Sequence, residues 1–153
     1  LHLCFTFSVI LCVSAAYDHC HDDNLNHVLR DKLKELLRKR KAKYNCKLEE
    51  KAAYDISLYN LNDPENPEDV KKILKFMNER TVAYKAKYFK SREKLYKQMK
   101  ILGKGRNVGC VHLLNQSKIT HDRQNHTILT VAAYIAKYHR YICLIEKTYW
   151  WWF

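Results

Sequence analysis

The stretch Tyr44-Asn45-Cys46-Lys47-Leu48-Glu49-Glu50-Lys51-Ala52-Ala53 combines a cysteine with apolar residues at helical spacing. This spacing predicts a helix from Cys46 to Tyr59 with a buried stripe that contains Leu48, Ala52 and Ile56. Another cysteine stands in Val108-Gly109-Cys110, within a valine-containing segment, 107–114, that is typical of a strand. The two stretches therefore predict a cysteine-stapled fold built from helices and strands.

Length and the N-terminal residues set the domain organisation. The chain has 153 residues, enough for one core, so we expect a single domain over 17–153. Residues 1–16 are apolar, lack lysine, arginine and carboxylates, and end in small residues, which predicts a secretory signal with cleavage after Ala15 or Ala16. A membrane-spanning helix needs roughly 20 apolar residues, so no transmembrane segment is expected. A buried N-terminal strand is the alternative interpretation.

The cysteines agree with secretion. Cys4 and Cys12 lie in the predicted signal, and the other four are Cys20, Cys46, Cys110 and Cys143. In an oxidising compartment these four predict two disulfides, with three connectivities open. Zinc is the competing explanation, but no pair has the close spacing of structural zinc sites. Sequons at Asn115 and Asn125 predict glycosylation of a surface loop.

The remaining pattern predicts helices first and strands last, an α+β fold. Leucines from Leu25 onward predict an amphipathic helix with a basic face, and Asn66-Pro67 predicts the start of another helix after the loop 60–67. Its helical pattern continues to Met99, with a break near Ser91. Strands are predicted at 107–114 and within 128–145, with Tyr138-His139-Arg140 connecting the last two.

The order of these phrases resembles the CAP superfamily, also called SCP/TAPS. The chain is most similar to the small activation-associated secreted proteins of parasitic nematodes, over 24–58 and 94–143. The resemblance implies an α-β-α sandwich with a small antiparallel sheet. It also implies the pairing of Cys110 with Cys143, which leaves Cys20 for Cys46.

Departures from the family pattern fall on its cleft positions. Alignment on Leu29-Arg30 places Asn26 where the family has a histidine, and a one-residue shift would bring His27 there. Leu95, three residues before Gln98, replaces a second histidine. Because neither replacement supplies an imidazole, we expect no metal in this cleft and no cofactor. The resemblance makes Glu49 a structural or former cleft carboxylate.

Catalysis has little support elsewhere in the sequence. There is no Gly-x-Ser-x-Gly elbow and no phosphate-binding glycine loop, and the adjacent Glu49 and Glu50 lie on different helical faces. One metal site is an alternative: cleavage after Ala16 would begin the mature chain Tyr17-Asp18-His19, whose amine, amides and imidazole suit Cu(II) or Ni(II). The prediction is a protein that is not an enzyme.

Charge gives the other functional indication. The chain carries 28 lysines and arginines against 16 carboxylates, a formal net charge of +12. The densest basic segments are 85–100 and the run that contains Arg38, Lys39, Arg40, Lys41 and Lys43. Such segments attract polyanions, although solvated helix faces explain them equally well. The aromatic residues lie at core spacing and no recognition motif is present, so nucleic acid is not expected as a partner.

Two functions follow from the sequence. The favoured one is a secreted, non-enzymatic CAP-like interaction protein that acts on an extracellular or host protein. The alternative is an effector that binds a glycosaminoglycan or an anionic lipid surface, with the aromatic residues 149–153 as an interfacial anchor.

Overall fold

Eight elements of secondary structure make up the part of the chain that the computed structural model describes, residues 20–59, 61, 63–102, 104–114 and 139–148. In chain order they are α2 (His27–Lys39), β1 (Lys43–Tyr44), α3 (Cys46–Tyr59), α4 (Pro67–Glu79), β2 (Tyr84–Phe89), α5 (Arg92–Lys100), β3 (Asn107–Leu114) and β4 (His139–Glu146). The predictions for the signal 1–16, His19, the sequons at Asn115 and Asn125, the strand segment 128–138 and residues 149–153 lie outside these residues.

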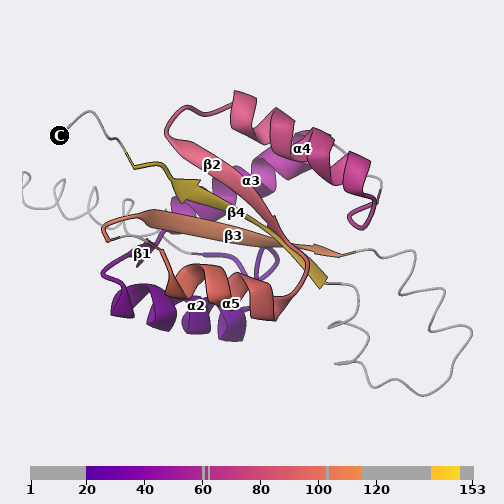
Figure 1. The fold of residues 1–153 in the computed structure, drawn as a ribbon. Coiled ribbons are helices and arrows are strands. Elements are labelled where there is room, and N and C mark those ends of the chain that lie inside the picture. The colour runs from indigo at the N-terminus through magenta and orange to yellow at the C-terminus, as the bar shows by residue number, and fades with distance from the viewer. Residues whose placement is uncertain (1–19, 60, 62, 103, 115–138, 149–153) are drawn as a thin grey trace, which may run out of the picture.

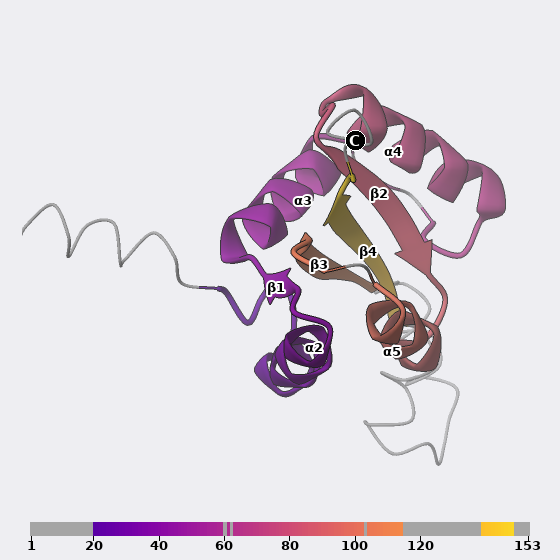
Figure 2. The same ribbon diagram turned by 60° about the vertical axis from the view of Figure 1, so that its left-hand side comes forward.

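The elements form three layers. The sheet has the order β1-β3-β4-β2, in which β1 is parallel to β3 and the other neighbours are antiparallel. Helices α2 and α5 cover one face of the sheet, and α3 and α4 cover the other (Figures 1 and 2). The α+β class predicted from the sequence is therefore confirmed, with a mixed sheet in place of the predicted antiparallel one.

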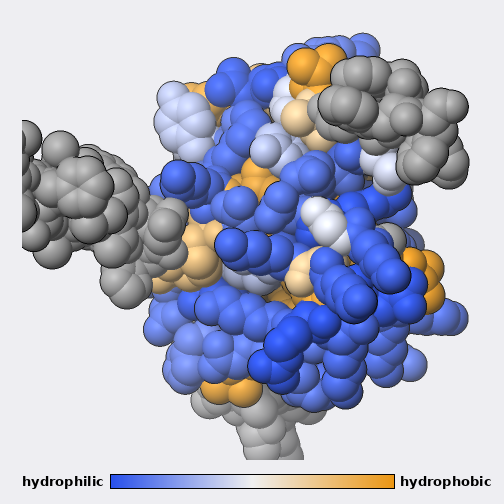
Figure 3. Space-filling model, turned by 90° about the vertical axis from the view of Figure 1, so that its left-hand side faces the viewer, coloured by the Kyte–Doolittle hydropathy of each residue, from blue (hydrophilic) through white to orange (hydrophobic). Residues whose placement is uncertain are grey.

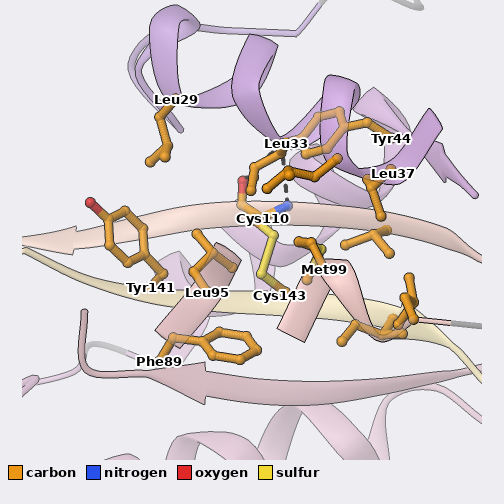
Figure 4. Close-up of a cluster of buried hydrophobic side chains, with 14 of the residues drawn as sticks. Leu29, Leu33, Leu37, Tyr44, Phe89, Leu95, Met99, Cys110, Tyr141 and Cys143 are labelled. Atoms are coloured by element: carbon orange, nitrogen blue, oxygen red, sulfur yellow. Dashed lines mark hydrogen bonds between the residues drawn. A yellow bond between two sulfur atoms is a disulfide. The ribbon is translucent and has the colours of Figure 1, made fainter. Parts of the chain in front are cut away.

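Strand β4 separates two hydrophobic cores because its side chains alternate between the faces. Tyr141, Cys143 and Ile145 pack with leucines of α2 and with Leu95 and Met99 of α5 (Figure 4). Ile142 and Leu144 pack on the opposite face with residues of α3, α4 and β2, namely Ala52, Ile73, Met77 and Ala86. Burial on both faces explains why this strand reads as a continuous apolar run.

Both disulfides lie next to these cores. Cys20 is bonded to Cys46, which joins the segment before α2 to the first residue of α3. Cys110 is bonded to Cys143, its direct cross-strand partner in the β3–β4 ladder. This is the pairing that the family resemblance implied. The two bonds span 26 and 33 residues of sequence.

The prediction of one helical pattern from Val70 to Met99 was wrong between Tyr84 and Phe89, which form β2. Tyr84 and Tyr88 are four residues apart, so they satisfy a helical stripe, but they also alternate with Lys85 and Lys87 as in a strand. Pairing with β4 decides between the two periods. The predicted order, helices followed by a sheet, is wrong for the same reason.

The predicted ends of the helices are largely confirmed by their caps. The Asn66 side chain accepts a hydrogen bond from the Glu68 amide at 2.9 Å, with Pro67 at the first helical position. The break near Ser91 is the start of α5, where Ser91 Oγ accepts from the Lys94 amide at 3.2 Å. The prediction that His139 and Arg140 belong to a connection between strands was wrong, because they are the first two residues of β4.

Gly109 is required by the contact between β3 and α3. A Cβ atom at this position would lie 2.6 Å from Leu48 Cβ and 2.5 Å from the Leu48 carbonyl carbon, closer than unbonded carbons approach. Helix α3 therefore rests directly on the β3 backbone. Gly105, in the turn before β3, has a φ of 74° and open space around it.

Gly109→Ala should destabilise the protein by about 3 kcal/mol, because the added methyl group overpacks the α3–β3 contact. The control is Gly105→Asn, which should cost less than about 1 kcal/mol because asparagine tolerates the left-handed conformation. Urea unfolding of both variants measures the difference. Equal unfolding midpoints for Gly109→Ala and the wild type would refute the close contact.

Candidate functional site

The structure does not bring the four predicted cleft positions together into one site. Asn26 caps α2, where its Oδ1 accepts from the Val28 amide at 2.8 Å and the Leu29 amide at 3.4 Å. Leu95 has no exposed surface and belongs to the core between α5 and the sheet. Glu49 is buried at the start of α3, whereas Gln98 lines a pocket at the edge of the sheet.

Glu49 is the centre of a buried hydrogen-bond network. Its Oε1 accepts from Arg30 Nε at 2.9 Å and from the Tyr44 hydroxyl at 2.7 Å. Its Oε2 accepts from the His21 amide at 3.1 Å. The other end of the Arg30 guanidinium donates to the His21 and Leu25 carbonyl oxygens at 2.7 and 2.8 Å. Each charge is thus paired and hydrogen-bonded inside the protein, as buried charges require.

Charge states in this network are fixed by its surroundings. Burial opposes the charge of Arg30, but the hydrogen bond and the negative charge of Glu49 raise its pKa above the usual value. Burial and the Glu49 carboxylate raise the pKa of Tyr44 well above its ordinary range. The Tyr44 hydroxyl therefore stays protonated, donating to Glu49 while it accepts from the Cys110 amide at 3.3 Å. This geometry supports a structural role for Glu49.

Asp55 is a second buried carboxylate, which the sequence did not single out. It lies on α3 with no exposed surface, and its Oδ1 accepts from Arg80 Nε at 2.9 Å. Lys51, one turn earlier, approaches its Oδ2 at 3.7 Å. Asp55 thereby ties α3 to the end of α4, and its i,i+4 spacing from Lys51 was the one signal available in the sequence.

A hollow of about 290 Å³, here called the histidine hollow, lies beside the start of α2 and is lined by residues from α5, β3 and β4. Its described lining consists of Asn26, Val28, Leu29, Arg92, Tyr96, His112, His139 and Tyr141. The His112 and His139 rings stack with their centroids 5.1 Å apart. Burial lowers the pKa of both imidazoles, that of His139 to about 4, so both are neutral at pH 7.

The histidine hollow contains Asn26, one of the four predicted cleft positions, but its two histidines were not predicted. Neither His112 nor His139 lies in a motif, and their approach depends on the β3–β4 register, which pairs His112 with Tyr141. Nothing local in the sequence could have identified the pair. Across the described part of the chain, no group of three or more histidine, cysteine or acidic side chains is arranged to hold a metal ion.

A larger hollow of about 340 Å³, here called the basic pocket, lies at the opposite end of the sheet. Its lining residues are Lys85, Lys87, Gln98, Leu102, Arg106, Ile145, Glu146, Lys147 and Thr148. Lys85 and Lys87 flank the buried Ala86 on β2, so strand alternation directs them to the α5 side of the sheet, opposite Ile145 and Cys143. Helix α5 ends at Lys100, beside this part of the sheet.

The predicted basic segment 38–43 adjoins this pocket. The Gly105 amide donates to the Lys41 carbonyl at 2.8 Å, and the Lys43 amide donates to the Arg106 carbonyl at 2.9 Å. Arg40 Nε donates to the Leu102 carbonyl at 3.0 Å. The predicted polyanion-binding residues, Arg38, Lys39, Arg40, Lys41 and Lys43, are all exposed. The fold thus places two basic regions, distant in sequence, side by side.

This end of the molecule is shown in Figure 3, and hydrophilic residues cover most of it. No helix in the described residues has the length and apolar character needed to cross a bilayer. Comparison of the chain with protein-family models, with curated proteins and with solved structures found no match. The site must therefore be interpreted from its own geometry.

Glu49→Ala should destabilise the protein by about 3–5 kcal/mol, because it leaves the Arg30 guanidinium buried without its counterion. Glu50→Ala is the matched control: Glu50 is exposed and its pair with His21 at 3.4 Å lies at the surface. That variant should change stability by less than about 0.5 kcal/mol. Chemical unfolding at neutral pH compares the two, and similar losses in both would contradict the structural role of Glu49.

Proposed function

We propose that this protein is a secreted, non-enzymatic interaction protein of CAP-like type, a parasite excretory/secretory protein that acts on an extracellular or host protein. The observation that carries the proposal is that three of the predicted cleft positions hold side chains that stabilise the fold. Asn26 caps a helix, Glu49 neutralises Arg30, and Leu95 fills the core. These side chains stabilise the fold and are not arranged around a common substrate.

The order of elements also supports the CAP-like assignment. The Leu29-Arg30 helix, the Glu49 helix, the Gln98 helix and the two cysteine-bearing strands follow one another as in the family pattern, within three layers. Arg30 and Glu49 come from two of the matched phrases and contact each other at 2.9 Å. A shared architecture does not imply a shared activity, so this assignment supports the scaffold and leaves the activity to be argued from the surface.

Secretion is part of the same proposal. It is supported by the apolar N-terminal segment, the two sequons and the two disulfides, which are typical of oxidising compartments. A protein that acts outside the cell benefits from such covalent links, because each bond of this loop length restricts the unfolded chain by roughly 3–4 kcal/mol.

A second candidate function is the binding of an extracellular polyanion, either a glycosaminoglycan or an anionic membrane surface. The contiguity of segment 38–43 with the basic pocket favours it, because clustered cations attract polyanions more strongly than scattered ones. The two candidates make different demands on the partner: one needs a folded protein, the other only a dense negative charge.

One capture experiment separates the two candidates. Mature protein purified from the medium of expressing cells is immobilised and exposed to host extracellular fluid, before and after heparinase treatment of that fluid. The favoured function predicts saturable capture of a host protein, and the amount captured should not change after heparinase treatment. Protein that has been reduced and alkylated is the control and should capture none, because the surface no longer exists.

Capture that disappears after heparinase, or in the presence of excess heparin, would instead favour the polyanion. Absence of saturable capture in every arm, together with no binding to anionic lipid vesicles, would refute both candidates.

A further inference from the structure

The basic pocket gathers cations from three separate segments of the chain. Lys85 and Lys87 come from β2, Arg106 comes from the turn before β3, and Lys147 follows β4. The Lys147 amide donates to the Ala83 carbonyl at 2.8 Å, which fixes the end of β4 beside the start of β2. The Arg106 guanidinium donates to the Thr148 hydroxyl, which orients it toward the same segment.

Ion pairs among the described residues do not neutralise these positive charges. Within the described part of the chain, no ion pair involves Lys85, Lys87, Arg106 or Lys147. Glu146 is the single carboxylate among the described lining residues, and its Oε2 accepts from Asn107 Nδ2 at 2.7 Å. Four cations around one hydrogen-bonded carboxylate leave a net positive recess, which suits an anionic group from outside.

The recess continues into a longer path of positive charge. The turn that contains Gly105 and Arg106 is joined to the exposed segment 38–43 by two backbone hydrogen bonds, one between Gly105 and Lys41 and one between Lys43 and Arg106. Lys104 is also exposed in this turn. We call the whole path the basic belt, and its residues are Arg38, Lys39, Arg40, Lys41, Lys43, Lys104, Arg106, Lys147, Lys85 and Lys87.

We propose that the basic pocket binds a sulfate group of a sulfated glycosaminoglycan, whose chain continues along the basic belt. This inference rests on the second candidate function and gives that function a site. The guanidinium of Arg106 can donate two parallel hydrogen bonds to one sulfate, while the lysines act as point charges around it. Thr148 and Gln98 add polar groups for the sugar hydroxyls.

A linear polymer fits this surface better than a membrane does. A recess of about 340 Å³ accepts a protruding group, whereas a peripheral membrane protein usually buries apolar side chains among the acyl chains. Two of the large hydrophobic residues that are exposed in the described chain are near the pocket: Ile101 precedes the pocket residue Leu102, and Val82 precedes Ala83, whose carbonyl accepts from the Lys147 amide. The other three, Val28, Tyr54 and Leu58, are not adjacent in sequence to a pocket residue, so the apolar surface beside the pocket consists of two isolated side chains.

The test compares two triple variants of the mature full-length protein with equal loss of charge. The pocket variant is Lys85→Gln, Lys87→Gln and Lys147→Gln. The control is Lys71→Gln, Lys72→Gln and Lys75→Gln, which changes exposed lysines of α4 on the other face of the sheet. Unfolding midpoints verify that both variants fold, and calorimetry with a heparin hexasaccharide at 150 mM salt measures the affinity.

We expect the pocket variant to bind the hexasaccharide at least about tenfold more weakly, and the control to stay within about twofold of the wild type. The dependence of affinity on salt should also become shallower in the pocket variant alone, because fewer counterions are released. A fully desulfated hexasaccharide should lose most of the affinity for the wild type.

The outcomes distinguish this inference from the function on which it rests. Equal losses in the two variants would overturn the pocket as the sulfate site while leaving polyanion binding intact. Absence of hexasaccharide binding by the wild type, together with no binding to phosphatidylserine vesicles, would overturn both. Binding to such vesicles without binding to the hexasaccharide would overturn the glycosaminoglycan assignment and favour a membrane surface.

Discussion

The buried ion pair between Arg30 and Glu49 is the contact on which the arrangement of the first half of the chain depends. It joins α2 to α3, and the Tyr44 hydroxyl extends it to β1 and to the backbone of β3. The His21 backbone enters the same network beside the Cys20–Cys46 disulfide. Because one charge without the other would be buried and unpaired, these segments are stable only when they are assembled together.

Two other constraints act at the same place. Gly109 lets α3 rest on the β3 backbone, and the Cys110–Cys143 bond fixes β3 against β4 one residue further on. The centre of the protein is therefore closely packed around two of the predicted cleft positions. This packing uses Glu49 and Leu95 for stability. The two hollows, the histidine hollow and the basic pocket, lie at the ends of the sheet.

Elements with strong local signals could be predicted from the sequence. Helix α3 has the bounds that its apolar spacing predicts, β3 has the bounds of its valine-containing segment, and Asn66 and Ser91 mark helix starts through their own hydrogen bonds. Strand β2 could not be predicted, because its tyrosines satisfy a helical period and a strand period at once. Pairing with a distant strand resolved that ambiguity, and no local pattern reports such pairing.

The candidate sites also contain some residues that the sequence could identify and others that it could not. The exposed run 38–43 was visible as a dense set of charges, but its neighbours Arg106 and Lys147 depend on the register of three strands. The stacking of His112 on His139 likewise depends on the β3–β4 ladder. Cross-strand neighbours are set by long-range packing, so a sequence names the residues that could form a site without saying which of them meet.

The most specific claim is the proposal that the basic pocket, and not the predicted cleft positions, binds a sulfated glycosaminoglycan. Amide chemical-shift mapping with a sulfated heparin oligosaccharide tests that claim most directly. The account predicts that the largest shifts fall on Lys85, Lys87, Arg106 and Lys147, with smaller ones along 38–43. Shifts concentrated at Asn26, Arg92 and His112 around the histidine hollow, or no shifts at all, would contradict it.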